Sequence, residues 1–182
     1  MVSIFVNVAG RFGINGKEAE RFFKFAVVGA MGFIVDFGVS NLLLGPFDYL
    51  LQEGRGLHDF VARFGAAPAD QALLFAGTIS FICAIVSNFV WNRYWTYPDS
   101  RTKSFRRQFF QFTVVSVAGI IIRSPILSFT YGPFTNLVAN IPSLAPYAQR
   151  VGANLSLVLA VAIVMFWNFF INRYWTYNDV ES

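Results

Sequence analysis

Residues 88–97 read NFVWNRYWTY, and residues 168–177 read NFFINRYWTY. These two stretches, called here the signatures, are identical at eight of ten positions and lie 80 residues apart. Each follows a long apolar run, at the point where a membrane-spanning helix would meet water. Amphipathic aromatic rings and an arginine that can reach phosphates are typical of that boundary. The signatures therefore predict a duplicated membrane unit whose second helix ends at the membrane surface.

Composition supports the same fold class. The chain has 182 residues, of which 55% are hydrophobic and 13% are charged, and its mean hydropathy is +0.52. A soluble domain carries roughly a quarter charged residues. Apolar runs of about the ~20 residues that cross a bilayer cover 25–44, 71–91, 108–131 and 151–171. We predict an all-α integral membrane protein with four transmembrane helices, the first and third ending at Gly45-Pro46 and Gly132-Pro133.

The duplication extends beyond the signatures. FFKF at 22–25 matches FFQF at 109–112, and Gly45-Pro46 matches Gly132-Pro133, both at an offset of 87 residues. Each copy holds two spans, so both copies must enter the membrane in the same orientation, as a parallel repeat. The predicted organisation is an interfacial segment at 1–20, a four-helix domain at 21–177 with repeats at 21–97 and 108–177, and a frayed polar tail at 178–182.

Lysine and arginine counts near the span ends predict the orientation. One side receives ten of these residues: Arg11, Lys17, Arg21, Lys24, Arg93, Arg101, Lys103, Arg106, Arg107 and Arg173. The opposite loops hold three: Arg55, Arg63 and Arg150. This asymmetry places both termini and both signatures in the cytoplasm. The net charge of +4 then indicates anionic lipid headgroups as partners, and not nucleic acid.

Two ionisable residues fall near the middle of predicted spans, Asp36 in the first and Arg123 in the third. Insertion of each costs ~2.5–3.5 kcal/mol, and the two positions are equivalent at the offset of 87 residues. One interpretation is a buried ion pair that only fixes helix packing. The other is a polar site inside the membrane, where Arg123 meets a phosphate or sugar hydroxyls and Asp36 is its partner in the empty state. Apolar packing could replace a purely structural pair at little cost.

The signature side chains have two interpretations as well. Asn88 and Asn92 share a helix face, as do Asn168 and Asn172, because each pair is four residues apart. These amides could bond to a neighbouring helix or bind sugar hydroxyls at a cytoplasmic entrance. Small residues are expected to let helices approach closely: Gly29, Ala30, Gly32, Gly38, Gly77, Ser80 and Ala84.

The signature arginines, Arg93 and Arg173, match phosphate geometry bidentately. An arginine at headgroup level can also serve only as an orientation anchor.

Catalytic and metal-binding patterns are missing from the sequence. It has one cysteine, Cys83, and one histidine, His58, so we expect no metal site and no cofactor. It also lacks a Gly-rich phosphate loop, a Ser/His/Asp set and a pair of carboxylates on one span. We therefore do not expect an enzyme.

The FFKFAVVG approach to the first span, the four spans and the NRYWTY endings resemble the GtrA-like family over about residues 21–177. The resemblance implies a small protein of the bacterial inner membrane associated with polyprenyl-phosphate-linked sugars; a related module accompanies some dolichol-phosphate mannose synthases. The implied activity moves a lipid-linked monosaccharide, such as undecaprenyl-phosphate-glucose, to the outer leaflet for cell-surface polysaccharide modification. The cytoplasmic arginines Arg93, Arg173, Arg106 and Arg107 would then gather the phosphate, and Asp36 with Arg123 would mark the midpoint.

Further expectations concern partners. Four spans are few for an enclosed pathway, so we expect a homo-oligomer, most simply a dimer. The alternative function is a non-transporting anchor that recruits a membrane glycosyltransferase through the basic segment 101–107. A small multidrug exporter is disfavoured, because it would be expected to carry a membrane carboxylate without a nearby compensating arginine.

Overall fold

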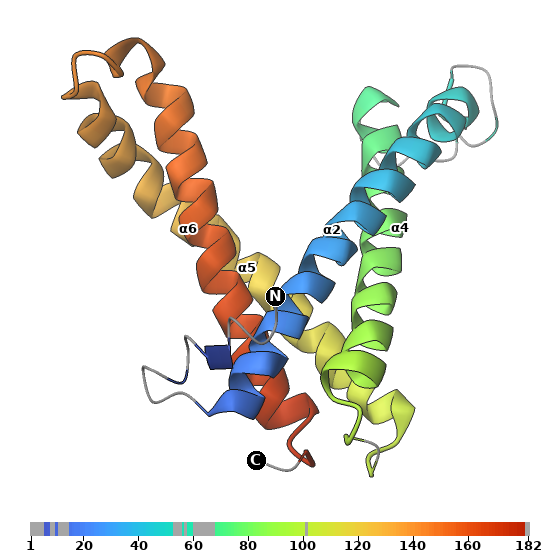
Figure 1. Cartoon of the computed structure of the whole chain (residues 1–182). Helices are drawn as coiled ribbons and strands as arrows, with labels where there is room; N and C mark the ends of the chain where they lie inside the picture. Colours follow the sequence, from blue (N-terminus) through green and yellow to red (C-terminus); the bar gives the residue numbers. More distant parts are fainter. Residues whose placement is uncertain are drawn as a thin grey trace. The chain divides into compact units, whose positions relative to one another are not determined.

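A computed structural model describes residues 6–7, 10, 15–52, 56, 58–59, 68–100 and 102–180 of the chain. It contains four long helices (Figure 1): α2 Gly16–Leu50, α4 Pro68–Trp91, α5 Phe105–Ala139 and α6 Ala148–Ile171. All four are long and apolar enough to cross a membrane, and the described residues include no strand. The prediction of an all-α protein with four membrane spans is confirmed.

Three short elements complete the described chain. The 3₁₀ helix η2, Ala145–Tyr147, leads into α6. The π-helix η1, Asn92–Thr96, continues α4, and the π-helix η3, Asn172–Thr176, continues α6. Both π-helices lie within the signatures.

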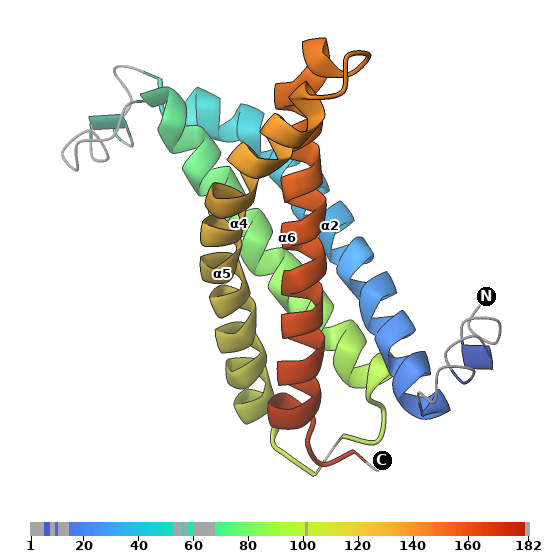
Figure 2. The ribbon, with the colours of Figure 1, turned by 90° about the vertical axis from the view of Figure 1, so that its left-hand side faces the viewer.

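The chain divides into two units, which are described separately. Unit 1 is Met1–Pro98 and unit 2 is Asp99–Ser182. In unit 1, α2 packs along α4, and in unit 2, α5 packs along α6 (Figures 1 and 2). Each unit is thus a helical hairpin that ends in a signature.

The first helix of each unit is longer than predicted. α2 continues through Pro46, and α5 continues through Pro125 and Pro133. The prediction that these spans stop at the Gly-Pro pairs is wrong. Proline removes one hydrogen-bond donor, but its fixed φ of about −65° is compatible with a helix, and membrane helices tolerate it. Each helix has 35 residues, which is ~52 Å at ~1.5 Å per residue, so both extend beyond a ~30 Å hydrocarbon layer.

A glycine and a signature asparagine meet where the helices of each hairpin pack. A Cβ on Gly32 would lie 2.6 Å from Asn88 Cγ, and closer still to its amide oxygen and nitrogen. A Cβ on Gly119 would lie 2.9 Å from Asn168 Nδ2. Because glycine has no side chain, the asparagine of the second helix fits against the first. The expected close approach is confirmed at Gly32.

Other glycines of unit 1 do not have this role. A Cβ on Gly29, Gly38 or Gly77 would have no described atom within 4 Å. Within unit 1, the helices therefore do not approach closely at these three positions.

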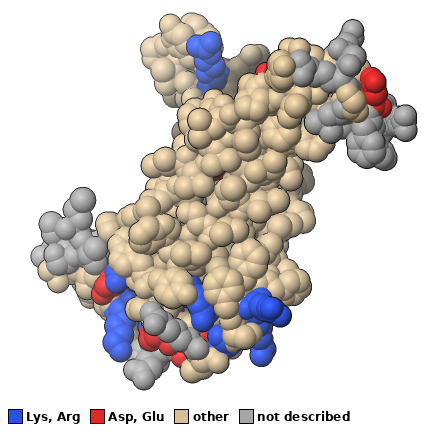
Figure 3. Space-filling view, turned by 90° about the vertical axis from the view of Figure 1, so that its right-hand side faces the viewer, with Lys and Arg blue, Asp and Glu red and all other residues tan. Residues whose placement is uncertain are grey.

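Large apolar side chains cover the outside of the hairpins. Phe33, Phe37 and Phe129 are 69%, 64% and 79% exposed. The face of the spans visible in Figure 3 carries almost no charged side chain. Such a surface suits lipid contact, because a soluble protein rarely exposes so large an apolar patch.

We predict that Gly32→Ala destabilises unit 1 by about 1–3 kcal/mol, because the added methyl group overpacks the contact with Asn88. Gly29→Ala is the matched control on the same helix, and it should be neutral or slightly stabilising, since alanine favours helix over glycine. Thermal unfolding in detergent measures both. Equal melting temperatures for the two variants would contradict the close contact.

Candidate functional site

Each signature forms a widened helical turn. The Tyr97 N–H donates to the Asn92 carbonyl over 2.8 Å, and the Tyr177 N–H donates to the Asn172 carbonyl over 2.8 Å. Both bonds span five residues, which defines a π-helix. Such turns insert one residue into a helix and occur frequently at functional sites. The sequence predicts that helices end at the signatures, but it does not predict their π-helical geometry.

The widened turn sorts the signature side chains into two groups. The buried group comprises Asn92, Arg93, Thr96 and Tyr97 in unit 1, and Asn172, Arg173, Thr176 and Tyr177 in unit 2. The remaining two positions are exposed: Tyr94 and Trp95, and Tyr174 and Trp175. Exposed aromatic rings suit the lipid–water boundary. The two arginines, by contrast, are only 8% and 6% exposed, so a phosphate that reaches them must enter the protein.

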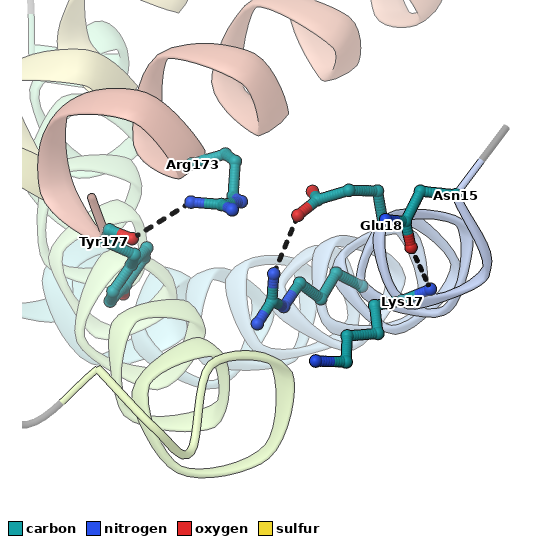
Figure 4. Close-up of polar contacts among 6 residues, drawn as sticks. Asn15, Lys17, Glu18, Arg173 and Tyr177 are labelled. Atoms are coloured by element: carbon teal, nitrogen blue, oxygen red, sulfur yellow. Dashed lines mark hydrogen bonds and ion pairs between the residues drawn. The ribbon is translucent and has the colours of Figure 1, made fainter. Parts of the chain in front are cut away.

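Arg173 has local contacts that hold its side chain. Its Nη1 lies 3.5 Å from the Tyr177 carbonyl oxygen (Figure 4). Its guanidinium carbon lies 5.6 Å from the centre of the Tyr174 ring, within the range of a cation–π interaction.

In unit 2 the signature amides form a continuous chain along the helix. Asn168 Nδ2 donates to the Val164 carbonyl over 3.0 Å, and Asn172 Nδ2 donates to the Asn168 carbonyl over 2.8 Å. Thr176 Oγ1 donates to Asn172 Oδ1 over 2.8 Å. These bonds stabilise the widened turn, and they run within α6 and η3 and not to the neighbouring helix that the packing interpretation expected.

In unit 1, the side-chain oxygens equivalent to those of Asn172 and Thr176 do not form this bond. Asn92 Oδ1 and Thr96 Oγ1 are buried, and neither has a hydrogen-bond partner among the described residues. Asn88 Oδ1 and its equivalent in unit 2, Asn168 Oδ1, are both without a partner in the described part of the chain, so among these oxygens the two units differ only at Asn92 and Thr96. Buried polar atoms normally find a partner. The signature of unit 1 therefore retains capacity for a ligand that donates hydrogen bonds.

Asp36 has a specific partner in its own unit. Ser80 Oγ on α4 donates to Asp36 Oδ1 over 2.6 Å, and Ser80 is 1% exposed. The sequence suggested Ser80 only as a small residue that permits helix packing. A hydrogen bond between positions 44 residues apart cannot be deduced from spacing alone.

Arg123 lies on α5 with an exposed side chain. Residues 100–178 contain no aspartate or glutamate, so the described spans of unit 2 offer the guanidinium no carboxylate. A pairing with Asp36 would join the two units and remains a prediction.

A set of contacts, called here the clasp, ties the residues around the start of α5 to Asp179, near the end of the chain. Asp179 accepts hydrogen bonds from Ser100 Oγ (2.5 Å), Thr102 Oγ1 (2.5 Å) and Thr102 N–H (3.1 Å). Gln108 Nε2 donates to Ser100 Oγ over 2.7 Å and to its carbonyl over 3.2 Å. The prediction that residues 178–182 are frayed is wrong at Asp179, because these bonds hold it.

Lys103 adds a charge to the clasp. Its Nζ donates to the carbonyls of Trp175 (2.9 Å) and Thr176 (3.2 Å). Burial lowers the pKa of Lys103, partly opposed by the charge of Asp179. Burial alone would raise the pKa of Asp179, but the hydrogen bonds from Ser100 and Thr102 outweigh it and hold that pKa below its usual value.

Arg106 and Arg107 follow the clasp on the first turn of α5. Both side chains are exposed, and the Arg107 N–H donates to the capping Ser104 hydroxyl over 3.4 Å. Cations at a helix N-terminus oppose the helix dipole. Two arginines at this position therefore favour a bound anion, such as a lipid phosphate.

The start of α2 differs chemically from the start of α5. The Asn15 side chain accepts from the Lys17 N–H over 2.9 Å at the beginning of α2 (Figure 4). The buried Arg21 pairs with Glu18 over 2.7 Å and lies 6.0 Å from the centre of the Tyr97 ring. At the offset of 87 residues, the position of Arg21 is occupied in unit 2 by the buried Gln108.

A second pair of equivalent positions shows the same difference. Lys24 lies 5.9 Å from the centre of the Trp95 ring, and its counterpart in unit 2 is the buried Gln111. At these two pairs of equivalent positions, unit 1 has cations and unit 2 has amides. Sequence reasoning did not single out the two glutamines; their equivalence to basic residues was the available signal.

We predict that Asp179→Ala destabilises unit 2 at pH 7 by about 1 kcal/mol, the low end for bonds to a partly exposed charged acceptor. The pKa of Asp179 is depressed in the folded state. Its contribution is therefore present above the unfolded pKa of ~3.9 and is lost as pH falls through the lower folded value. Melting temperatures from pH 7 to pH 3 test this, with the exposed Asp48→Ala as control. A deficit that does not shrink at low pH would contradict the account.

A model of the family described as GtrA/DPMS, transmembrane domain, matches residues 24–177. A search of curated proteins finds no significant match. The matched range includes α2 from Lys24 onward, the whole of α4, α5 and α6, and both signatures. The chain is a multi-pass membrane protein that belongs to the GtrA/DPMS transmembrane family.

Proposed function

We propose that this protein moves a polyprenyl-phosphate-linked monosaccharide from the cytoplasmic to the outer leaflet of a bacterial inner membrane. The moved sugar then serves the synthesis or modification of cell-surface polysaccharide. Family membership supports a membrane role connected with lipid-linked sugars. The two hairpins act as a parallel repeat with both termini in the cytoplasm, in keeping with the excess of basic residues near the signatures.

The observation that carries the proposal is the pair of opposite charges at equivalent mid-span positions. Asp36 is the only charged residue between Lys24 and Asp48, and Arg123 is the only one between Arg107 and Arg150. A lone charge at such depth is costly and marks a functional site by default. A guanidinium within the membrane can bind a phosphate bidentately, which lets the lipid head cross a region that excludes it otherwise.

The cytoplasmic end supplies the first binding step. The exposed Arg106 and Arg107 attract the phosphate to the start of α5, and the buried Arg93 and Arg173 receive it within the widened turns. The open oxygens of Asn92 and Thr96 accept hydrogen bonds from sugar hydroxyls. The head then passes to Arg123, while the prenyl chain stays in lipid.

This activity breaks no covalent bond, so the protein acts as a transporter and not as an enzyme, without metal or cofactor. Two hairpins offer little surface to enclose a sugar head. We therefore propose that a dimer surrounds the pathway together with membrane lipids.

A second candidate function is supported by the clasp. The hydrogen bonds to Asp179 hold the segment before α5 and leave Arg106 and Arg107 exposed. A fixed basic surface at the membrane face could recruit a glycosyltransferase. In that case the protein alone would move no lipid.

The deciding experiment uses the protein alone, reconstituted in liposomes with a labelled polyprenyl-phosphate-glucose. We expect the labelled head to reach the opposite leaflet, and we expect Arg123→Ala to slow this at least tenfold, because a charge-assisted contact is worth ~1.5–3 kcal/mol. Arg150→Ala, which removes an exposed arginine of α6, is the matched control and should keep the wild-type rate. No movement with wild-type protein would favour the anchor.

Exchange of the two mid-span charges separates a structural role from a functional one. We predict that Asp36→Arg with Arg123→Asp restores the melting temperature lost in either single variant, because the pair can still form. Lipid movement should stay at least tenfold reduced, because the phosphate site has changed position. If the double variant recovered both folding and lipid movement, the pair would be structural only.

A further inference from the structure

The two signatures share the sequence NRYWTY, but their side chains are bonded differently. In unit 2, Thr176 Oγ1 donates to Asn172 Oδ1 over 2.8 Å. In unit 1, the equivalent atoms, Thr96 Oγ1 and Asn92 Oδ1, are buried and make no hydrogen bond to a described residue. The six residues and their π-helical backbone are the same in both units. The difference therefore comes from the surroundings of each turn.

A lysine holds the end of the widened turn in unit 2. Lys103 Nζ donates to the carbonyl oxygens of Trp175 over 2.9 Å and of Thr176 over 3.2 Å, the last two residues of η3. Carbonyls at the end of a helix have no partner within it and interact favourably with a cation. Two charge-assisted bonds from one ammonium group therefore fix the backbone that carries the Thr176 side chain.

The equivalent position of unit 1 has no side chain that could do this. At the offset of 87 residues that relates the first helices, Lys103 corresponds to Gly16. The next lysine of α2, Lys24, lies 5.9 Å from the centre of the Trp95 ring, so its ammonium group faces an aromatic ring of η1. The lysine that holds the turn is thus a feature of one unit only.

The clasp brings Lys103 to η3. Thr102, the preceding residue, is bonded to Asp179 through its N–H over 3.1 Å and through its hydroxyl over 2.5 Å. Asp179 lies three residues beyond Thr176. The segment before α5 and the end of η3 are therefore joined at two neighbouring points, and each attachment favours the other because it keeps the two segments side by side.

The turn that Lys103 holds also carries the buried Arg173. Arg173 Nη1 lies 3.5 Å from the carbonyl oxygen of Tyr177. Tyr177 directly follows Thr176, whose carbonyl Lys103 binds. A shift of the turn would therefore move the group that orients the guanidinium.

We propose that Lys103 is a positioning residue that keeps the signature of unit 2 closed on itself and holds Arg173 in place for a phosphate. The phosphate part of this inference rests on the proposed function. The closed Asn172–Thr176 pair then offers no open oxygen to sugar hydroxyls, and the open pair of unit 1, Asn92 and Thr96, is the one that accepts their hydrogen bonds.

The first test measures amide hydrogen exchange in detergent, without lipid-linked sugar. The Tyr177 N–H and the Tyr97 N–H each bond across a widened turn over 2.8 Å, so each reports the opening of its own turn. In the wild type, we expect Tyr177 to exchange about tenfold more slowly than Tyr97. Lys103→Met should speed exchange at Tyr177 about tenfold, since bonds from a charged donor are lost, and should leave Tyr97 unchanged.

Two further variants control this test. Lys103→Arg keeps a cation with several donors, so Tyr177 should stay protected. Lys17→Met removes an exposed lysine at the start of α2 and should change neither amide. Equal exchange of the two tyrosines in the wild type, which needs no variant to fold, would overturn the proposal. An unchanged Tyr177 in Lys103→Met would overturn it as well.

The second test measures lipid movement in liposomes over a range of polyprenyl-phosphate-glucose concentrations. Lys103→Met should raise the half-saturating concentration about tenfold, and more than it lowers the maximal rate per folded protein, because the guanidinium is no longer held in its binding position. Lys103→Arg should restore the wild-type value. A lysine that only stabilises the fold would lower the melting temperature and leave the half-saturating concentration unchanged, and that result would refute the positioning role.

The two tests separate this inference from the function on which it rests. If the wild-type protein moves no lipid, the proposed function fails, and hydrogen exchange still decides whether Lys103 holds the turn. If Lys103→Met weakens lipid binding but leaves exchange at Tyr177 unchanged, the lysine contacts the lipid itself, and the positioning role is refuted while the transport function stands.

Discussion

A charged side chain inside hydrocarbon needs a compensating group, and the two hairpins of this protein must each meet that requirement. Asp36 and Arg123 are the ionisable residues near the middle of α2 and α5. Unit 1 provides Asp36 with a hydroxyl from Ser80, and unit 2 contains no acidic residue in its spans for Arg123. Among the described residues, neither hairpin gives its mid-span ionisable residue a partner of opposite charge. The opposite charges at equivalent positions therefore make each hairpin depend on something beyond itself, whether the other hairpin or a charged lipid.

The two hairpins share a backbone arrangement but differ in their polar side chains and in the hydrogen bonds that these make. Both place an asparagine against a glycine of the first helix, and both widen the signature into a π-turn. In unit 2, hydrogen bonds occupy Asn172 Oδ1 and Thr176 Oγ1, and the clasp holds Asp179. In unit 1, Asn92 and Thr96 keep open oxygens among the described residues. The common scaffold is in keeping with the predicted duplication, and we propose that a ligand is recognised at the positions where the two units differ.

Much of the fold could be predicted from the sequence, because apolar length and charge placement are read directly from it. The four helices follow from these features. Helix ends were predicted less well: Pro46 and Pro133 were expected to stop the spans, because an interior proline removes a donor and clashes with the preceding turn, but membrane helices tolerate it. The widened turns were also missed, because they arise from a shift of one residue in backbone bonding that no residue type dictates.

The candidate site was predicted in part. Asp36 and Arg123 are visible because charges in apolar runs are rare. Ser80 was not identified, since serine in a membrane helix is more often a small packing residue and its partner lies 44 positions away. Asp179 was missed for the same reason, because its partners lie 77 and 79 positions away. Gln108 was missed because its role comes from burial, which local pattern does not contain.

The account depends most on whether the mid-span carboxylate and guanidinium meet. A thiol-specific cross-linker of short reach, applied to Asp36→Cys with Arg123→Cys in membranes of a Cys83→Ser background, measures this directly. We expect efficient cross-linking within one chain, and much less when Phe33→Cys, one turn away on an exposed face of α2, replaces the first cysteine. Equal and weak cross-linking of both pairs would show that the two charges lie apart, and the proposed pathway through the membrane would be wrong.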